Sequence, residues 1–147
     1  KKYVLNNLVK LYEGRGMYAE AARLMGNAAD INATFLSKMN DFTKSMELFI
    51  KAGKYNEADV AFTKALACVN TENERFALKT KRKEQLKNQA KDYLNKDKRR
   101  NAADAYEKLL SVDLTALEKQ EAQKALLGLY EKLGMIREFY SLKRNIG

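Results

Sequence analysis

Apolar and polar positions follow the period of an amphipathic α-helix along most of the chain, and one arrangement of them recurs. Around Gly16 it places aromatic or other apolar residues four positions earlier and two, five, nine and twelve positions later: Tyr12, Tyr18, Ala21, Met25 and Ala28. Around Gly53 the same positions hold Phe49, Tyr55, Ala58, Phe62 and Ala65. Agreement at this many positions indicates an internal repeat.

Two further copies are weaker. Asp97 takes the place of the glycine in the third copy, where the five positions are Tyr93, Arg99, Ala102, Tyr106 and Leu109. Aspartate tolerates the left-handed backbone conformation that glycine adopts easily, so the turn can still form. The fourth copy, around Gly134, keeps Tyr130 and Ile136 but has Phe139 and Lys143 where the others have alanine and a large apolar residue.

The repeat predicts helical hairpins in which the glycine ends one helix and the alanines let the two helices approach closely. Capping boxes are expected at Thr71–Glu74 and Thr115–Glu118, and a softer helix start at Asn32-Ala33-Thr34. Eight helices are therefore predicted, at residues 3–15, 17–30, 34–52, 55–69, 72–95, 98–112, 115–133 and 135–145.

The predicted fold is all-α, with four hairpins in a right-handed superhelix and no β-strand, because each hairpin buries one face on the next. The repeated aromatic and alanine positions should be buried: Tyr12, Ala21, Ala28, Phe49, Ala58, Phe62, Ala65, Tyr93 and Tyr106. The helix at 135–145 is polar enough to close the stack. The first helix is apolar on more than one face, so the N-terminal end of the stack is expected to continue into further protein or to contact another subunit.

In this repeat the chain resembles the tetratricopeptide repeat (TPR) family. Asn7–Tyr12 followed by Gly16, Tyr18, Ala21 and Ala28 is similar to the family's helix-turn-helix pattern, and Ala52-Gly53-Lys54-Tyr55-Asn56-Glu57-Ala58 is closer still. The turn residues are 37, 44 and 37 positions apart, longer than the family's repeat, and its closing proline is missing. The resemblance implies one TPR-like domain over 1–147, with units near 1–33, 34–71, 72–114 and 115–147. The sequence starts without a methionine and directly in helical periodicity, so we expect it to be a piece of a longer protein.

Composition argues against several classes of function. The chain has no histidine, the commonest general base and metal ligand, and its single Cys68 cannot form an internal disulfide. No glycine-rich phosphate loop, signal peptide or membrane-length apolar run is visible. We therefore expect a non-enzymatic, cytoplasmic protein without a cofactor, metal or small-molecule substrate.

The resemblance implies a peptide or helix of a partner protein, bound in a groove lined by the first helix of each hairpin. Polar residues expected along this groove include Lys10 and Lys44. One TPR subset grips the C-terminal carboxylate of chaperones with conserved lysines, asparagines and an arginine. Here the matching positions hold Asn6, Lys10, Lys44, Glu84 and Asn88. Glu84 would repel a carboxylate, so that activity is not expected.

A row of cations is the most individual feature of the sequence. Residues 71–100 carry eleven basic and five acidic side chains, which accounts for two thirds of the net charge of +9. A step of four residues drifts only about 40° around a helix, so residues at this spacing form one line. Basic residues recur there every four positions, with Arg82 alongside: Arg75, Lys79, Lys83, Lys87 and Lys91. This basic row is either a solvated helix face or a contact surface for RNA, an acidic protein segment or an anionic membrane.

A protein partner is favoured over RNA on the sequence. Single-stranded nucleic acid is usually bound with exposed aromatic side chains that stack on the bases. Phe76 and Tyr93, the aromatic residues nearest the basic row, are expected to face the core. The chain is therefore predicted to be a scaffold or adaptor for protein–protein interaction, with RNA or anionic-surface binding through residues 72–95 as the alternative.

Overall fold

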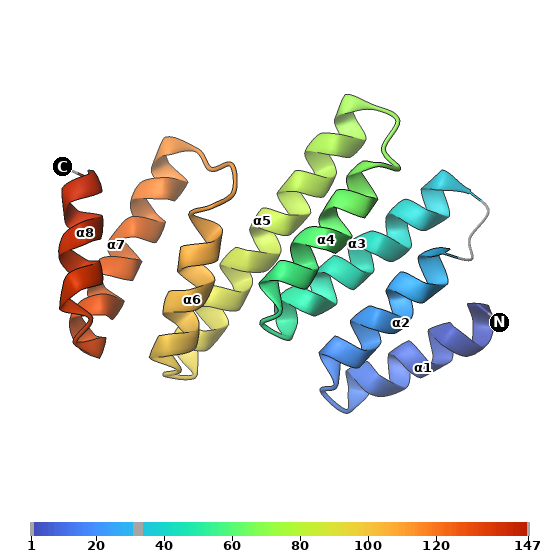
Figure 1. Cartoon of the computed structure of the whole chain (residues 1–147), viewed down its shortest axis with the longest axis horizontal. Helices are drawn as coiled ribbons and strands as arrows, with labels where there is room; N and C mark the ends of the chain where they lie inside the picture. The colour runs from blue at the N-terminus through green and yellow to red at the C-terminus, as the bar shows by residue number, and fades with distance from the viewer. Residues whose placement is uncertain (1, 31–33, 147) are drawn as a thin grey trace. The chain divides into compact units, whose positions relative to one another are not determined.

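The computed structural model describes residues 2–30 and 34–146, and in these ranges it is helical with no β-strand (Figure 1). The helices follow one another as α1 (Lys2–Gly14), α2 (Tyr18–Asp30), α3 (Phe35–Lys51), α4 (Tyr55–Leu66), α5 (Glu72–Asn95), α6 (Arg99–Leu109), α7 (Ala116–Leu133) and α8 (Ile136–Ile146). The predicted all-α fold is confirmed, and every helix begins and ends within three residues of the predicted position.

All four hairpin turns have the same geometry. The turn residues Gly16, Gly53 and Gly134 have φ of 74°, 75° and 71°, and Asp97 has 58°. In each turn the following residue donates its N–H to the carbonyl five positions earlier, at 2.8–2.9 Å, which is the long hydrogen bond of a Schellman motif. The fourth copy therefore keeps the turn although its second helix departs from the repeat.

The helix starts are also those expected. The side chains of Thr71 and Glu74 each accept a hydrogen bond from the other's backbone N–H, both at 3.1 Å. Thr115 and Glu118 form the same pair, with the Glu118 carboxylate accepting at 3.0 Å and the Thr115 hydroxyl at 3.2 Å. Thr34 caps α3 by accepting from the N–H of Ser37. The other two residues of that predicted start, 32 and 33, lie outside the described residues. Each cap satisfies backbone N–H groups that have no partner inside the helix.

The chain divides into two compact units, Lys1–Arg82 and Lys83–Gly147, with the boundary inside α5. In unit 1, α1 packs on α2, α2 on α3 and α3 on α4; in unit 2, α6 packs on α7 and α7 on α8. Alanines, aliphatic residues and aromatic rings fill both cores, and the alanines let the helices lie close together. No described helix combines the length and apolar character that crossing a bilayer requires.

Seven of the nine residues predicted to be buried are buried, whereas Tyr12 and Tyr93 are half-buried. One expectation is wrong. Phe76 is 73% exposed, because it lies two residues before the buried Leu78 and therefore about 200° away from it around α5. The cations expected on α8 are exposed, but Ile136 and Tyr140 are also exposed there, at 67% and 58%.

Candidate functional site

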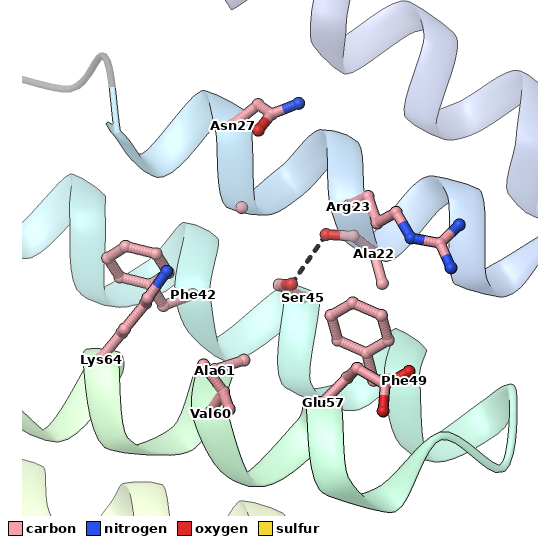
Figure 2. A pocket seen from close by; sticks show the side chains of 11 residues that line it. Ala22, Arg23, Asn27, Phe42, Ser45, Phe49, Glu57, Val60, Ala61 and Lys64 are labelled. Carbon is pink, nitrogen blue, oxygen red and sulfur yellow. Dashed lines mark hydrogen bonds between the residues drawn. The ribbon is translucent and has the colours of Figure 1, made fainter.

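Unit 1 contains a groove of about 390 Å³ between α2 and α4, floored by α3 (Figure 2). The floor comes from one stripe of α3 and the adjoining part of α4: Phe42, Ser45, Phe49 and Ala61. Phe42 and Phe49 are 7% and 8% exposed, so each ring presents only an edge or part of a face to the groove. The floor is therefore largely apolar, with one hydroxyl in it.

That hydroxyl fixes the neighbouring helix. Ser45 donates its Oγ–H to the carbonyl of Ala22 at 2.7 Å, so it satisfies a buried polar pair and ties α2 to α3 (Figure 2). A Cβ on Gly26 would lie 3.8 Å from the Ser45 Oγ, an ordinary contact distance. The floor and the α2 wall are thus set by hydrogen bonding and small residues, which gives the groove a defined shape.

The rim carries charge and one exposed apolar residue. Arg23 lies on the α2 side and pairs with Glu20 at 3.6 Å. Lys64 of α4 holds its Nζ 5.7 Å from the centre of the Phe42 ring. Val60 lines the same wall, outside the buried stripe of α4, and is 56% exposed. The site combines an apolar bottom with a mixed, mainly cationic edge.

Unit 2 has a groove at the same repeat positions. It also measures about 390 Å³ and lies between α6 and α8, over Leu126 and Tyr130 of α7. In α4 and in α8 the lining residues stand four, seven, eight and eleven positions after the turn residue: Glu57, Val60, Ala61 and Lys64 in the one, Glu138, Ser141, Leu142 and Asn145 in the other. The unit 2 groove contains a hydrogen bond between two of its lining side chains. Tyr130 donates its hydroxyl to Glu107 across it, and burial and this carboxylate raise the pKa of Tyr130.

Unit 2 also has a depression beside two of the first helices of the predicted hairpins. This depression of about 430 Å³ lies between α5 and α7, over Ala125, Gly128 and Leu129, and is bordered by Leu94. In unit 1 the residues expected on such a surface are placed differently. Lys44 forms an ion pair with Glu13 of α1 at 3.2 Å, while Lys10 is exposed on α1.

The basic row forms as a line along α5, but several of its members contact acidic residues of the chain. Lys83 and Lys87 both donate to Glu118 of α7, the Lys83 bond measuring 3.0 Å, and their side chains are only 20% and 24% exposed. The Lys87 bond, together with the Thr115 cap and Lys83, lowers the pKa of Glu118 to about 2. The bond to Glu118 likewise raises the pKa of Lys87. These two lysines therefore hold α5 against α7.

The other row members differ among themselves. Arg82 stacks on Phe62 of α4, its guanidinium carbon 3.7 Å from the ring centre, and lies 3.9 Å from Asp59. Arg75 pairs with Glu72 at 3.8 Å, whereas Lys91 is exposed. Lys79 is half-buried. The row thus makes intramolecular contacts along much of its length, and Lys91 at its end is exposed.

Among residues 2–30 and 34–146, no group of histidine, cysteine, aspartate or glutamate residues is arranged to hold a metal ion. Cys68 is buried, with its Sγ 3.5 Å from the carbonyl oxygen of Lys64. The sequence matches no protein-family model, and no curated protein resembles it significantly.

The groove over α3 was missed by sequence reasoning. Its aromatic floor looks like ordinary core, because Phe42 and Phe49 fit the helical apolar stripe. Val60 gave a signal, since it lies about 200° from Ala58 and outside the buried stripe of α4. Single exposed apolar residues are common on protein surfaces, so this signal alone does not locate a partner site.

Proposed function

We propose that this chain is a non-catalytic interaction scaffold, and that the groove between α2 and α4 binds a short helical or extended segment of a partner protein. The observation that carries the proposal is the apolar floor of Phe42, Phe49 and Ala61 beneath a charged rim. Its volume of about 390 Å³ falls in the range of roughly 300–1,000 Å³ typical of ligand sites.

Such a groove suits one or two apolar side chains of a bound segment. Their burial supplies binding energy, while the surrounding rim excludes water and sets direction through hydrogen bonds. Arg23, Asn27 and Lys64 offer donors and Glu57 one carboxylate, so an acidic or polar flank beside the inserted side chains is favoured. Helix-in-groove recognition of this kind needs no catalytic group.

The contacts of the basic row favour a protein partner over RNA. Lys83 and Lys87 share the carboxylate of Glu118, and Arg82 is packed on Phe62. A polyanion would have to compete with these contacts to gain the row's charge. Phe76, next to Arg75 in the sequence, has an exposed ring on which a nucleic-acid base could stack. No second aromatic residue lies near it on α5 to stack on a neighbouring base.

The test is a charged residue placed in the groove. Val60→Arg places a cation in the groove wall without disturbing the core. The control, Leu36→Arg, places a cation outside the groove at a residue of similar exposure, 58% against 56% for Val60. Partners captured by the parent chain from the source cell are identified, and their affinities for the purified variants are measured. We expect Val60→Arg to lose a protein partner that Leu36→Arg retains.

Two results would contradict the proposal. One is equal binding by the two variants. The other is a captured partner that proves to be RNA, with an affinity that falls log-linearly with salt and is unaffected by Val60→Arg.

A further inference from the structure

The outer face of α8 carries large apolar and basic side chains together. Ile136, Tyr140 and Ile146 are 67%, 58% and 45% exposed, and no described residue of α8 is buried. Arg137, Lys143 and Arg144 are exposed on the same helix, with Glu138 as its one acidic residue. We name Ile136, Tyr140, Lys143 and Arg144 the α8 face.

This face corresponds to the surface that the other second helices use for packing. Tyr140 and Arg144 stand six and ten positions after their turn residue, as do Ala22 and Gly26 in α2. Ala22 accepts a hydrogen bond from Ser45 of α3, and Gly26 lies against the same side chain. In α6 the tenth position is Glu107, which accepts from Tyr130 of α7. These positions face the following first helix in both units.

The residues at these positions are different in α8. The fifth and sixth positions are a pair of alanines in α2 and in α6, all at most 1% exposed: Ala21, Ala22, Ala102 and Ala103. In α8 they are Phe139 and Tyr140, whose rings meet edge to face at 5.3 Å. Two rings in place of two methyl groups prevent a helix from approaching α8 as closely as α3 approaches α2. A helix on this face would instead contact the outer part of Tyr140 and Ile136.

We propose that the α8 face binds a helical segment of a partner protein that carries acidic residues beside apolar ones. Charge complementarity decides the occupant. Lys143 and Arg144 follow Tyr140 by three and four positions and so lie on the same side of α8, with the Lys143 Nζ 5.6 Å from the centre of the Phe139 ring. Carboxylates on the segment would meet these cations while its apolar side chains cover Ile136 and Tyr140. A second copy of the α8 face would bring like charges together. This proposal is independent of the groove between α2 and α4.

The experiment uses the whole chain and a displayed library of four-turn helical peptides. Each peptide has a fixed apolar stripe, flanked by positions at which acidic, basic or neutral polar residues are all allowed. Peptides selected on the parent chain are synthesised, and their affinities are measured by fluorescence anisotropy. We expect acidic flanks to be enriched, and binding to weaken as ionic strength rises.

The variants are Tyr140→Ala and Arg144→Glu, each expected to weaken binding by about tenfold, as for a central contact residue. Leu36→Arg, at an exposed residue outside both surfaces, is the control and should leave the affinity unchanged. Val60→Arg tests whether the peptides occupy the unit 1 groove instead. Because Tyr140 and Arg144 are exposed, neither change removes core packing, and circular dichroism verifies the fold.

Four results would overturn the proposal. The first is that the selected peptides are not enriched in acidic residues. The second is that Tyr140→Ala and Arg144→Glu bind the peptides as tightly as the parent chain does. The third is that the parent chain self-associates and Tyr140→Ala abolishes this. The fourth is binding to phosphatidylserine vesicles that depends on Tyr140 while selected peptides fail to compete. A loss of binding in Val60→Arg alone would show instead that the peptides occupy the unit 1 groove.

Discussion

The glycine inside α7 and the glycine that caps its C-terminus, six residues apart, should respond in opposite ways to the same substitution. Gly134 ends the helix with φ of 71°, whereas Gly128 lies within it and has no positive φ. A Cβ built at either position meets no other atom within 4 Å. Alanine therefore adds no clash at either site, and the difference between the two variants reports backbone conformation alone.

The magnitudes follow from the two conformations. A left-handed conformation costs a residue with a Cβ about 1–2 kcal/mol. Part of this is offset, since alanine reduces the conformational entropy of the unfolded chain by about 0.4–1 kcal/mol. Gly134→Ala should thus destabilise by about 1 kcal/mol. Gly128→Ala should stabilise by about 0.5–1 kcal/mol, the usual gain on replacing glycine inside a helix.

Urea unfolding followed by far-UV circular dichroism measures both effects. The two midpoints should move to opposite sides of that of the parent chain, and the thermal midpoints should separate by several degrees. A shift of both variants in the same direction would refute the assignment of the turn as a left-handed glycine position. An unchanged midpoint for Gly134→Ala would refute the estimated strain.

Two further predictions concern packing and charge. Ala58 is 2% exposed between paired helices, so Ala58→Leu should destabilise by about 1–3 kcal/mol through overpacking, with a lower urea midpoint as the measure. Glu118 has its pKa lowered from 4.5 to about 2, so its stabilising effect is complete above pH 4.5 and is lost as pH falls through about 2. Glu118→Gln should accordingly be less stable than the parent chain at neutral pH, and the difference should shrink on acidification. The same difference at all pH values would exclude the ion pairs with Lys83 and Lys87 as its source.

Local signals predicted the fold well. The turns depend on a single residue that tolerates positive φ, and the helix starts at Thr71 and Thr115 depend on a partner three positions later. Such information lies within a few residues of chain, and the sequence shows it directly. The same reasoning placed Asp97 at a turn, where its φ of 58° confirms the prediction.

Side chains on α5 were harder to place because their contacts come from distant parts of the chain. Glu118 lies 35 positions after Lys83, and Asp59 lies before Arg82 on another helix. Spacing along α5 shows that the cations share a line, but it cannot show which of them meet a carboxylate. Phe76 was misplaced for a related reason, since an apolar residue near the start of a long helix is buried only where a neighbouring helix reaches it.

The net charge of a segment does not by itself show which of its cations remain exposed after folding. Residues 71–100 hold most of the positive excess, yet Lys83 and Lys87 contact the carboxylate of Glu118. Residues 101–147 carry no net charge, and their acids include Glu118 and Glu107, which accept hydrogen bonds from other helices. Their cations on α8 are exposed beside Tyr140. A neutral segment can thus present a positive surface, because what a partner meets is the charge left exposed after the helices have packed.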